Sequence, residues 1–127
     1  MQIKSQIKIF ISSLILTLII IRFFLFLSPS ANLNIGRYNI HHLYLGAFLI
    51  IVSLIFFILN IVNKFIIVLA GVSSALVLDE IVYLIATDGS DKAYLTPISL
   101  WGAIIFTSII VIFTLILYHL NKQKVRE

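Results

Sequence analysis

Four long apolar stretches, each close to twenty residues, dominate this sequence of 127 residues. They lie at about 7–27, 42–59, 65–86 and 97–120. A helix of roughly 20 apolar residues crosses the ~30 Å hydrocarbon core of a bilayer, and a helix satisfies its own backbone hydrogen bonds there. The sequence therefore predicts a single all-α transmembrane domain over residues 1–127, an integral membrane four-helix bundle.

The charge content also indicates a lipid environment. Only 11% of the residues are charged and 61% are hydrophobic, whereas a soluble domain carries about 25% charged residues. No basic stripe is present to follow phosphates, so we expect no nucleic acid partner. The expected partners are the lipid bilayer and either another membrane protein or a second copy of this chain. The absence of cysteine excludes disulfides and cysteine-based metal sites.

The segments between the apolar stretches carry turn and capping signals. These are a polar segment at 28–39, a tight turn at 60–64, an Asp88-Gly89 turn, and Thr96-Pro97 as N-cap and first helical residue. The first apolar stretch is longer than the core of a signal peptide and is interrupted by Arg22, so we expect a membrane span there.

The distribution of basic residues predicts the orientation. One side of the predicted bundle carries Lys4, Lys8, Lys64, Lys122, Lys124 and Arg126, whereas the loops of the other side carry Arg37 and Lys92 beside Asp88 and Asp91. Lysine and arginine are enriched in cytoplasmic loops. We therefore expect a multi-pass protein of the cell membrane with both termini cytoplasmic.

The membrane-buried charges are predicted to lie at a similar depth. With a rise of about 1.5 Å per residue, Arg22 and Asp79 both lie roughly 21 Å from the inner boundary, and His42 lies roughly 27 Å from it. Because a buried charge needs a partner in lipid, we expect an Arg22–Asp79 ion pair. The wider prediction is a polar cluster near the outer leaflet, made of Arg22, His41, His42, Asp79, Glu80 and Tyr83.

Small residues predict which helix faces pack. Gly71, Ala75, Asp79 and Tyr83 are spaced by four and share one face, and small residues at this spacing let helices approach closely in lipid. The second apolar stretch has a similar line containing His42 and Gly46. Asp79 is therefore expected on a packed face.

The cluster is compatible with several chemistries. A divalent metal could use His41, His42, Asp79 and Glu80 as ligands. The spacing is unfavourable, because helical neighbours point about 100° apart, and helical side chains lean toward their own N-terminus, which is expected to carry His42 away from the carboxylates. No cofactor is assigned on this basis.

Three classes of function follow from these features. The first is a structural, partner-binding or lipid-binding membrane protein, with the cluster as interhelical glue. The second is a metal-dependent or acid–base enzyme acting on a lipid at the outer interface. The third is a transporter or channel subunit, disfavoured because titratable residues are missing from the inner half of the spans. Interfacial anchoring is a simpler explanation for His41 and His42. Enzymatic activity is left open.

Two segments, "IHHLYLG" at 40–46 and "AGVSSALVLDEIVYL" at 70–84, resemble an uncharacterised family of small prokaryotic integral membrane proteins. The resemblance spans about residues 40–102 and leaves the first apolar stretch uncovered. The matching residues are His41, His42, Gly46, Gly71, Asp79 and Glu80, with looser matches at Tyr94 and Ser99. Ser73 and Ser74 stand where the family pattern has more glycine. The resemblance implies one shared polar site and no particular reaction.

Overall fold

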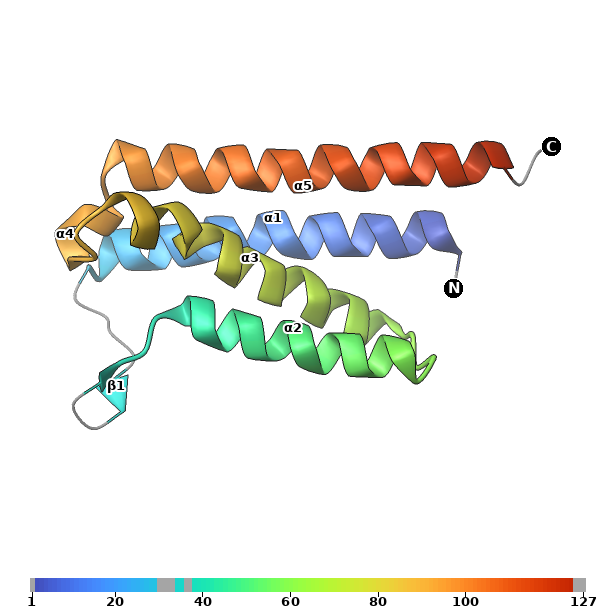
Figure 1. Ribbon diagram of the computed structural model, residues 1–127, viewed down its shortest axis with the longest axis horizontal. Coiled ribbons are helices and arrows are strands. Elements are labelled where there is room, and N and C mark those ends of the chain that lie inside the picture. The colour runs from blue at the N-terminus through green and yellow to red at the C-terminus, as the bar shows by residue number, and fades with distance from the viewer. Residues whose placement is uncertain (1, 30–33, 36–37, 125–127) are drawn as a thin grey trace.

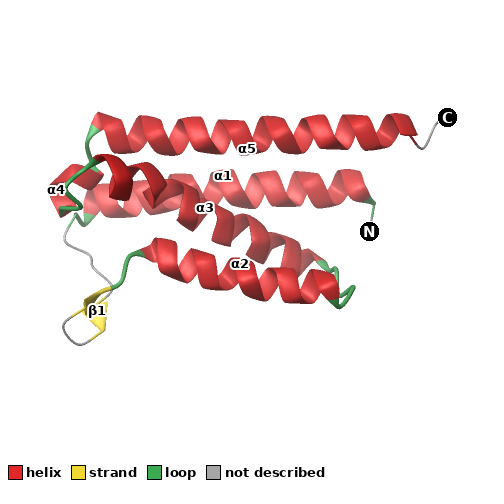
Figure 2. Ribbon diagram, viewed as in Figure 1, coloured by secondary structure: helices red, strands yellow, loops and turns green. Residues whose placement is uncertain are grey.

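The chain folds into an all-α bundle, as the sequence predicts. The structure is a computed structural model that describes residues 2–29, 34–35 and 38–124. Its helices are α1 (Ile3–Leu27), α2 (His42–Ile58), α3 (Lys64–Ala86), the one-turn α4 (Asp91–Tyr94) and α5 (Pro97–Lys124), shown in Figures 1 and 2. Between α1 and α2, β1 (Asn34–Ile35) and β2 (Tyr38–Asn39) form a short antiparallel hairpin that pairs Asn34 with Asn39.

Among the described residues, three helices are long and apolar enough to cross a membrane, judged by length and composition: α1, α3 and α5. The remaining apolar helix, α2, has 17 residues. Its length of about 25 Å is at the lower limit for a membrane span. Figure 1 shows both chain termini and the α2–α3 turn at the same end of the bundle. Arg37 and Arg126, which contributed to the predicted orientation, lie outside the described residues.

Local signals explain where the helices begin and end. Asn60 adopts φ 58° after α2, and the Ile61 N–H donates to the Phe56 carbonyl (2.9 Å), which closes the helix end. Asn63 then caps α3 by accepting from the Ile66 N–H at 3.0 Å. The helix α5 begins at Pro97, as expected, although the Thr96 hydroxyl donates to the Ala93 carbonyl.

The segment between α3 and α5 differs from the simple turn that the sequence predicts. A one-turn helix, α4, forms there because the Ser90 hydroxyl accepts from the Ala93 N–H and satisfies a free donor. This extra turn carries Tyr94 back over the end of the bundle, where its side chain is buried.

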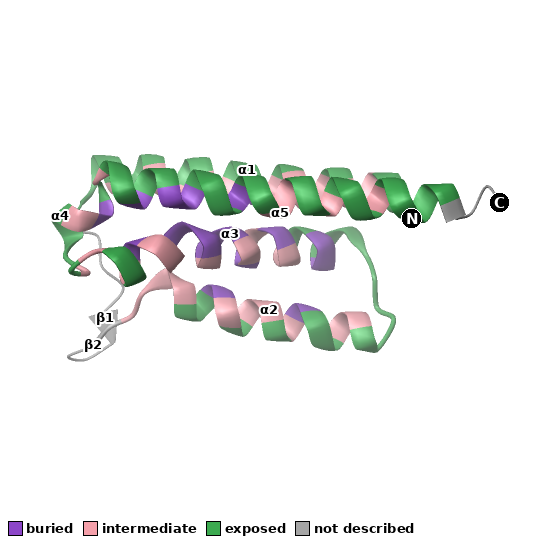
Figure 3. Cartoon of the chain, turned by 45° about the horizontal axis from the view of Figure 1, so that its top comes forward, coloured by how far each residue is buried: buried purple, intermediate pink, exposed green. Residues whose placement is uncertain are grey.

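The helix α3 occupies the centre of the bundle and contacts α1, α2 and α5. Figure 3 shows the buried residues concentrated along it. Glycines permit these approaches: a Cβ on Gly46 would lie 2.8 Å from the Ser73 carbonyl oxygen, a Cβ on Gly71 would overlap Ser13 of α1, and a Cβ on Gly102 would overlap Val82. The predicted packing face of α3 is confirmed, since Gly71, Ala75, Asp79 and Tyr83 are all buried.

Candidate functional site

The predicted polar residues meet at the end of the bundle opposite the chain termini (Figure 1). There the last part of α1, the start of α2, the last part of α3, α4 and the start of α5 converge. On α1, the partly buried positions Leu18, Ile21 and Arg22 recur at helical spacing, so the face that packs against α3 also carries Arg22.

Asp79 is the centre of the cluster, and its side chain is 0% exposed. Its Oδ1 accepts from the Arg22 Nε–H, which confirms the predicted ion pair. Its Oδ2 accepts from the Tyr94 hydroxyl and from His42 Nε2 at 2.9 Å. Both oxygens of one buried carboxylate are therefore satisfied by side chains from three other elements.

Arg22 holds more than the carboxylate. Its Nη1 donates to the Tyr94 carbonyl at 3.0 Å, and its Nη2 lies 3.0 Å from the Asp79 carbonyl. The same Nη2 lies 3.2 Å from the Ser99 carbonyl and 3.1 Å from the Ser99 hydroxyl. The guanidinium also stacks over the Tyr94 ring, 4.3 Å from its centroid. One side chain of α1 thus binds α3, α4 and α5 together.

Glu80 connects the cluster to the start of α2. Its Oε1 lies 3.2 Å from His41 Nδ1 and 3.3 Å from His42 Nδ1, and its Oε2 accepts from the Leu43 N–H at 2.7 Å. The Leu43 N–H belongs to the first turn of α2, where backbone donors have no partner within the helix. A buried carboxylate of α3 therefore caps α2 from another element.

The predicted orientation of His42 is wrong. Its ring lies between Asp79 and Glu80 and contacts both carboxylates. The reason is the way α2 begins: His41 is extended (φ −62°, ψ 139°), and Glu80 draws the first turn of α2 toward α3. The lean of a side chain within a regular helix does not describe residues at this junction.

Tyr83 lies beside the cluster and does not bond to its carboxylates. Its hydroxyl donates to the Gly89 carbonyl at 2.5 Å. Its ring packs against His41 and Tyr94, with centroids 5.9 and 5.3 Å away. Tyr83 therefore forms a wall of the site and fixes the segment that leads into α4.

Sequence reasoning from the residues alone did not include Tyr94 and Ser99 among the site residues. The structure brings both into the cluster through Arg22 and Asp79. The signals for them in the sequence were the depth of Ser99, which is close to that of His42 when residues are counted along the helices, and a loose match of both residues to the pattern of the resembled family. Burial, and then the neighbouring Asp79 carboxylate, raise the pKa of the Tyr94 hydroxyl above its usual range. Tyr94 therefore remains a hydrogen-bond donor at neutral pH.

The cluster places two carboxylates, Asp79 and Glu80, close to the guanidinium of Arg22 and to the two histidine rings. Arg22 neutralises one of the two carboxylates, and an uncompensated second carboxylate would be costly in this buried setting. His42 has one ring nitrogen within hydrogen-bonding distance of each carboxylate. The His42 ring therefore bridges the two carboxylates, and its closer contact, 2.9 Å, is from Nε2 to Asp79 Oδ2.

His41 differs from His42 in its outer nitrogen. Its Nδ1 faces Glu80, whereas its Nε2 has no hydrogen-bond partner among the described residues. The His41 side chain is 23% exposed, compared with 4% for Glu80. The arrangement presents an accessible imidazole nitrogen in front of a buried carboxylate.

The four candidate metal ligands have other partners. Arg22 binds Asp79, and the two histidines bond to the two carboxylates. Among the described residues, no group of three or more His, Asp and Glu side chains is arranged to hold a metal ion. The side chains therefore form a salt-bridged network in which the Arg22 guanidinium, and not a metal ion, binds the Asp79 carboxylate.

A continuous path of titratable groups toward the chain termini is not present in the described part of the molecule. The buried polar residues outside the cluster are Ser53, Ser73 and Thr107. Ser53 and Ser73 donate to carbonyls of their own helices, Leu49 and Ala70. These contacts are typical of packing residues in apolar helices.

Comparisons with known proteins give no relative of this chain: no protein-family model, curated protein or solved structure matches it.

Proposed function

We propose that this chain is a multi-pass protein of the cell membrane that acts by binding a lipid or protein partner, and that the polar cluster locks its helices into the binding-competent arrangement. The observation that supports the lock is the reach of Arg22, which donates to five acceptor atoms on α3, α4 and α5. A binding function is favoured over a catalytic one because nearly every polar group of the cluster is already hydrogen-bonded or ion-paired to another group of the cluster.

The physical reason for a polar lock lies in the solvent. Helices in lipid gain little from hydrophobic association, so close packing and interhelical hydrogen bonds hold them together. Arg22 and the two carboxylates would each be costly in hydrocarbon if left alone. Gathering them at one end makes the arrangement of all the helices depend on a single network.

The test is an Asp79→Asn variant, with Asp88→Asn as the matched control. Both oxygens of Asp79 accept from donors, so an amide NH2 must face a donor, and the charge of Arg22 is left without its partner. We expect the free energy of unfolding in detergent to fall by about 3–5 kcal/mol. Asp88 is exposed, and its variant is expected to unfold like the unmodified protein. Equal stability of the two variants would contradict the lock.

A second candidate function is acid–base catalysis on a lipid at the outer interface. It is favoured by one observation: His41 Nδ1 faces the buried Glu80, and His41 Nε2 has no hydrogen-bond partner among the described residues. A carboxylate that accepts from Nδ1–H keeps the lone pair on Nε2, so that this atom can accept a proton from a substrate. On this hypothesis His41 is the general base and Glu80 orients it.

His41→Gln and His42→Gln separate the two functions. The protein is reconstituted into vesicles of phosphatidylethanolamine and phosphatidylglycerol, and new lipid products are measured by mass spectrometry. For an enzyme, His41→Gln abolishes the product and leaves the unfolding midpoint nearly unchanged, whereas His42→Gln lowers the midpoint. If the unmodified protein forms no product, the acid–base hypothesis is rejected for these lipids and the lock is unaffected.

A further inference from the structure

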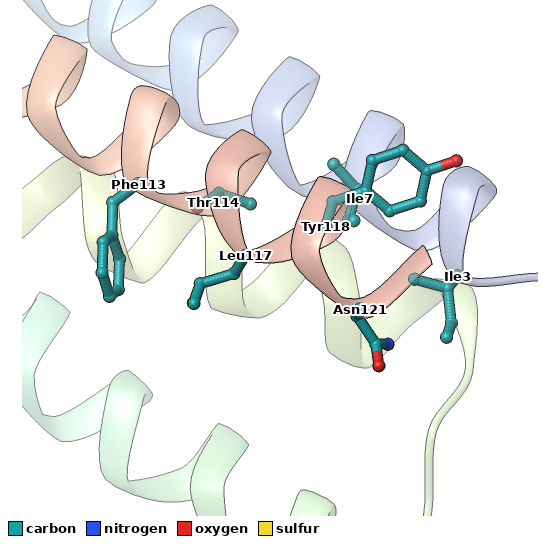
Figure 4. Close-up of a pocket in the computed structure, with 7 residues that line it drawn as sticks. All are labelled: Ile3, Ile7, Phe113, Thr114, Leu117, Tyr118 and Asn121. Carbon is teal, nitrogen blue, oxygen red and sulfur yellow. The ribbon is translucent and has the colours of Figure 1, made fainter. Parts of the chain in front are cut away.

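The opposite end of the bundle contains an open cavity of about 330 Å³ between α1 and α5. Figure 4 shows the lining residues, which are Ile3, Ile7, Phe113, Thr114, Leu117, Tyr118 and Asn121. The volume is within the ~300–1,000 Å³ range of small-molecule sites. The cavity is formed entirely by the first turns of α1 and the last turns of α5, so it is independent of the polar cluster.

The cavity lies along the second half of α5, where the helix is more exposed than in its first half. The buried residues of α5 among those described are Ser99, Gly102, Ala103 and Thr107, all in its first half. Figure 1 shows α3 beside α5 near α4 and beside α2 at the other end. The second half of α5 has no buried residue among those described, and side chains such as Phe113 and Leu117 are exposed.

The lining changes character along the cavity. Nearer the chain termini the lining residues are Ile3, Tyr118 and Asn121, of which the last two carry polar groups. Farther from the termini the lining is apolar except for Thr114, whose hydroxyl already donates to the Ile110 carbonyl of its own helix. An amphipathic ligand with its polar end toward the termini matches this order. In a bilayer, the apolar part of such a cavity lies at the level of the acyl chains.

The charge around the mouth indicates the sign of that polar end. Lys4 and Lys8 flank the lining residues of α1, and Lys122 follows Asn121 on α5; all three are exposed. Among the described residues, the acidic side chains lie in α3 and in the segment from Asp88 to Asp91, at the other end of the bundle. In the described part of the chain, no acidic side chain accompanies these lysines, and lysines near a membrane surface attract anionic headgroups at about 1 kcal/mol each.

We propose that this cavity binds an anionic phospholipid, with one acyl chain against Leu117 and Ile7 and the phosphate near Lys4, Lys8 and Lys122. This inference specifies the lipid side of the proposed function, and it rests on that function only in requiring that the chain lies in a bilayer. The bound lipid covers side chains in the second half of α5, such as Phe113 and Leu117, that are otherwise exposed.

The experiment is native mass spectrometry of the full chain in mild detergent, after exposure to equal amounts of phosphatidylglycerol and phosphatidylcholine. We expect one retained phosphatidylglycerol. Leu117→Trp fills the cavity and is expected to abolish retention, with Leu54→Trp on the exposed face of α2 as control. Each Lys→Gln change at the mouth is expected to lower the preference for the anionic lipid about fivefold, with Lys92→Gln at the other end as control.

Other outcomes overturn the proposal. Equal retention of the two lipids, or retention that survives Leu117→Trp, would show that the cavity is not a specific site. A dimer that Leu117→Trp disrupts would assign the cavity to a second copy of the chain. The thermal unfolding midpoint of Leu117→Trp is expected to match that of the unmodified protein, because the polar cluster is intact in this variant. A negative result for Asp79→Asn would therefore contradict the structural role of the cluster and not the lipid site.

Discussion

A single arginine, Arg22, determines how the polar end of this bundle is built. Its position in the last third of an apolar helix requires partners, and a planar guanidinium can donate in several directions at once. Asp79 supplies the charge, and the carbonyls of Tyr94 and Ser99 supply further acceptors. The Arg22 side chain is only 13% exposed, so water replaces few of these contacts.

The shape of the guanidinium, and not only its charge, is predicted to matter. Arg22→Lys keeps the positive charge but cannot reach acceptors on α3, α4 and α5 together. At an average of about 0.6 kcal/mol per interhelical hydrogen bond in membranes, we expect a loss of about 2 kcal/mol in the free energy of unfolding. Equilibrium unfolding of the unmodified protein and of Arg22→Lys in mixed detergent micelles measures this difference in the free energy of unfolding. A lysine variant as stable as the unmodified protein would show that charge alone suffices.

Tyr94 is predicted to make the free energy of unfolding of the protein decrease at alkaline pH. The pKa of its hydroxyl is raised above the ordinary 10.0 by burial and by Asp79, so folding favours the protonated form. The stability from this hydroxyl is complete below pH 10 and is lost progressively as the pH rises above it. Tyr94→Phe is therefore expected to unfold about 1 kcal/mol more easily at pH 7, with a difference that narrows above pH 10.

Free energies of unfolding measured from pH 7 to pH 11 test this dependence. Tyr44→Phe is the matched control, because Tyr44 is 60% exposed. A difference between the unmodified protein and Tyr94→Phe that stays constant across this range would contradict the assignment.

At the level of the helices, α3 is the element on which the others pack. Its contacts with α1, α2 and α5 each involve a glycine, at Gly71, Gly46 and Gly102. Close approach at these points brings the ends of the helices near enough for their polar side chains to bond. The polar cluster and the small-residue faces are therefore two parts of one packing arrangement.

Gly46→Ala is predicted to disturb the cluster without changing any of its polar residues. The new Cβ would lie 2.7 Å from Leu76 Cβ and 2.8 Å from the Ser73 carbonyl oxygen, so α2 must move away from α3. Overpacking of this kind costs about 1–3 kcal/mol. Leu45→Ala, at a neighbouring exposed position, is the control and is expected to change thermal stability far less. Equal effects of the two variants would contradict the packing argument.

At the level of the whole molecule, charge and polarity are divided between the two ends. One end holds the cluster together with Asp88, Asp91 and Lys92, and the other holds both termini and the exposed Lys4, Lys8 and Lys122 (Figure 1). Because lysine and arginine are enriched on the cytoplasmic side, cytoplasmic termini and an even number of spans remain the prediction for this protein. The lipid cavity and the polar cluster would then face different leaflets.

Labelling of single cysteines tests this topology, since the chain has no native cysteine. We introduce Lys4→Cys, Lys122→Cys and Asp88→Cys separately and add a membrane-impermeant maleimide to intact cells. We expect labelling of Asp88→Cys alone, and of all three after permeabilisation. Labelling of only one terminus in intact cells would mean that an odd number of helices crosses the membrane, in which case the 17-residue α2 is the helix that does not.

Hydropathy and local signals determined much of this protein by themselves. The observed helices begin and end within a few residues of the four predicted stretches, because apolar length and capping residues act along the chain. Helical periodicity also identified the packed face of α3, and depth counting paired Arg22 with Asp79. Each of these depends on the spacing of residues within one helix.

Only the tertiary structure decided how the helix ends meet. The position of His42 between two carboxylates depends on Glu80 capping α2, and the inclusion of Tyr94 depends on the extra turn at α4. The cavity at the other end depends on α3 leaving α5 as it crosses toward α2. These features follow from the directions of whole helices, which are set by contacts between distant residues such as Gly46 with Ser73 and Gly102 with Val82, and no local pattern in the sequence carries that information.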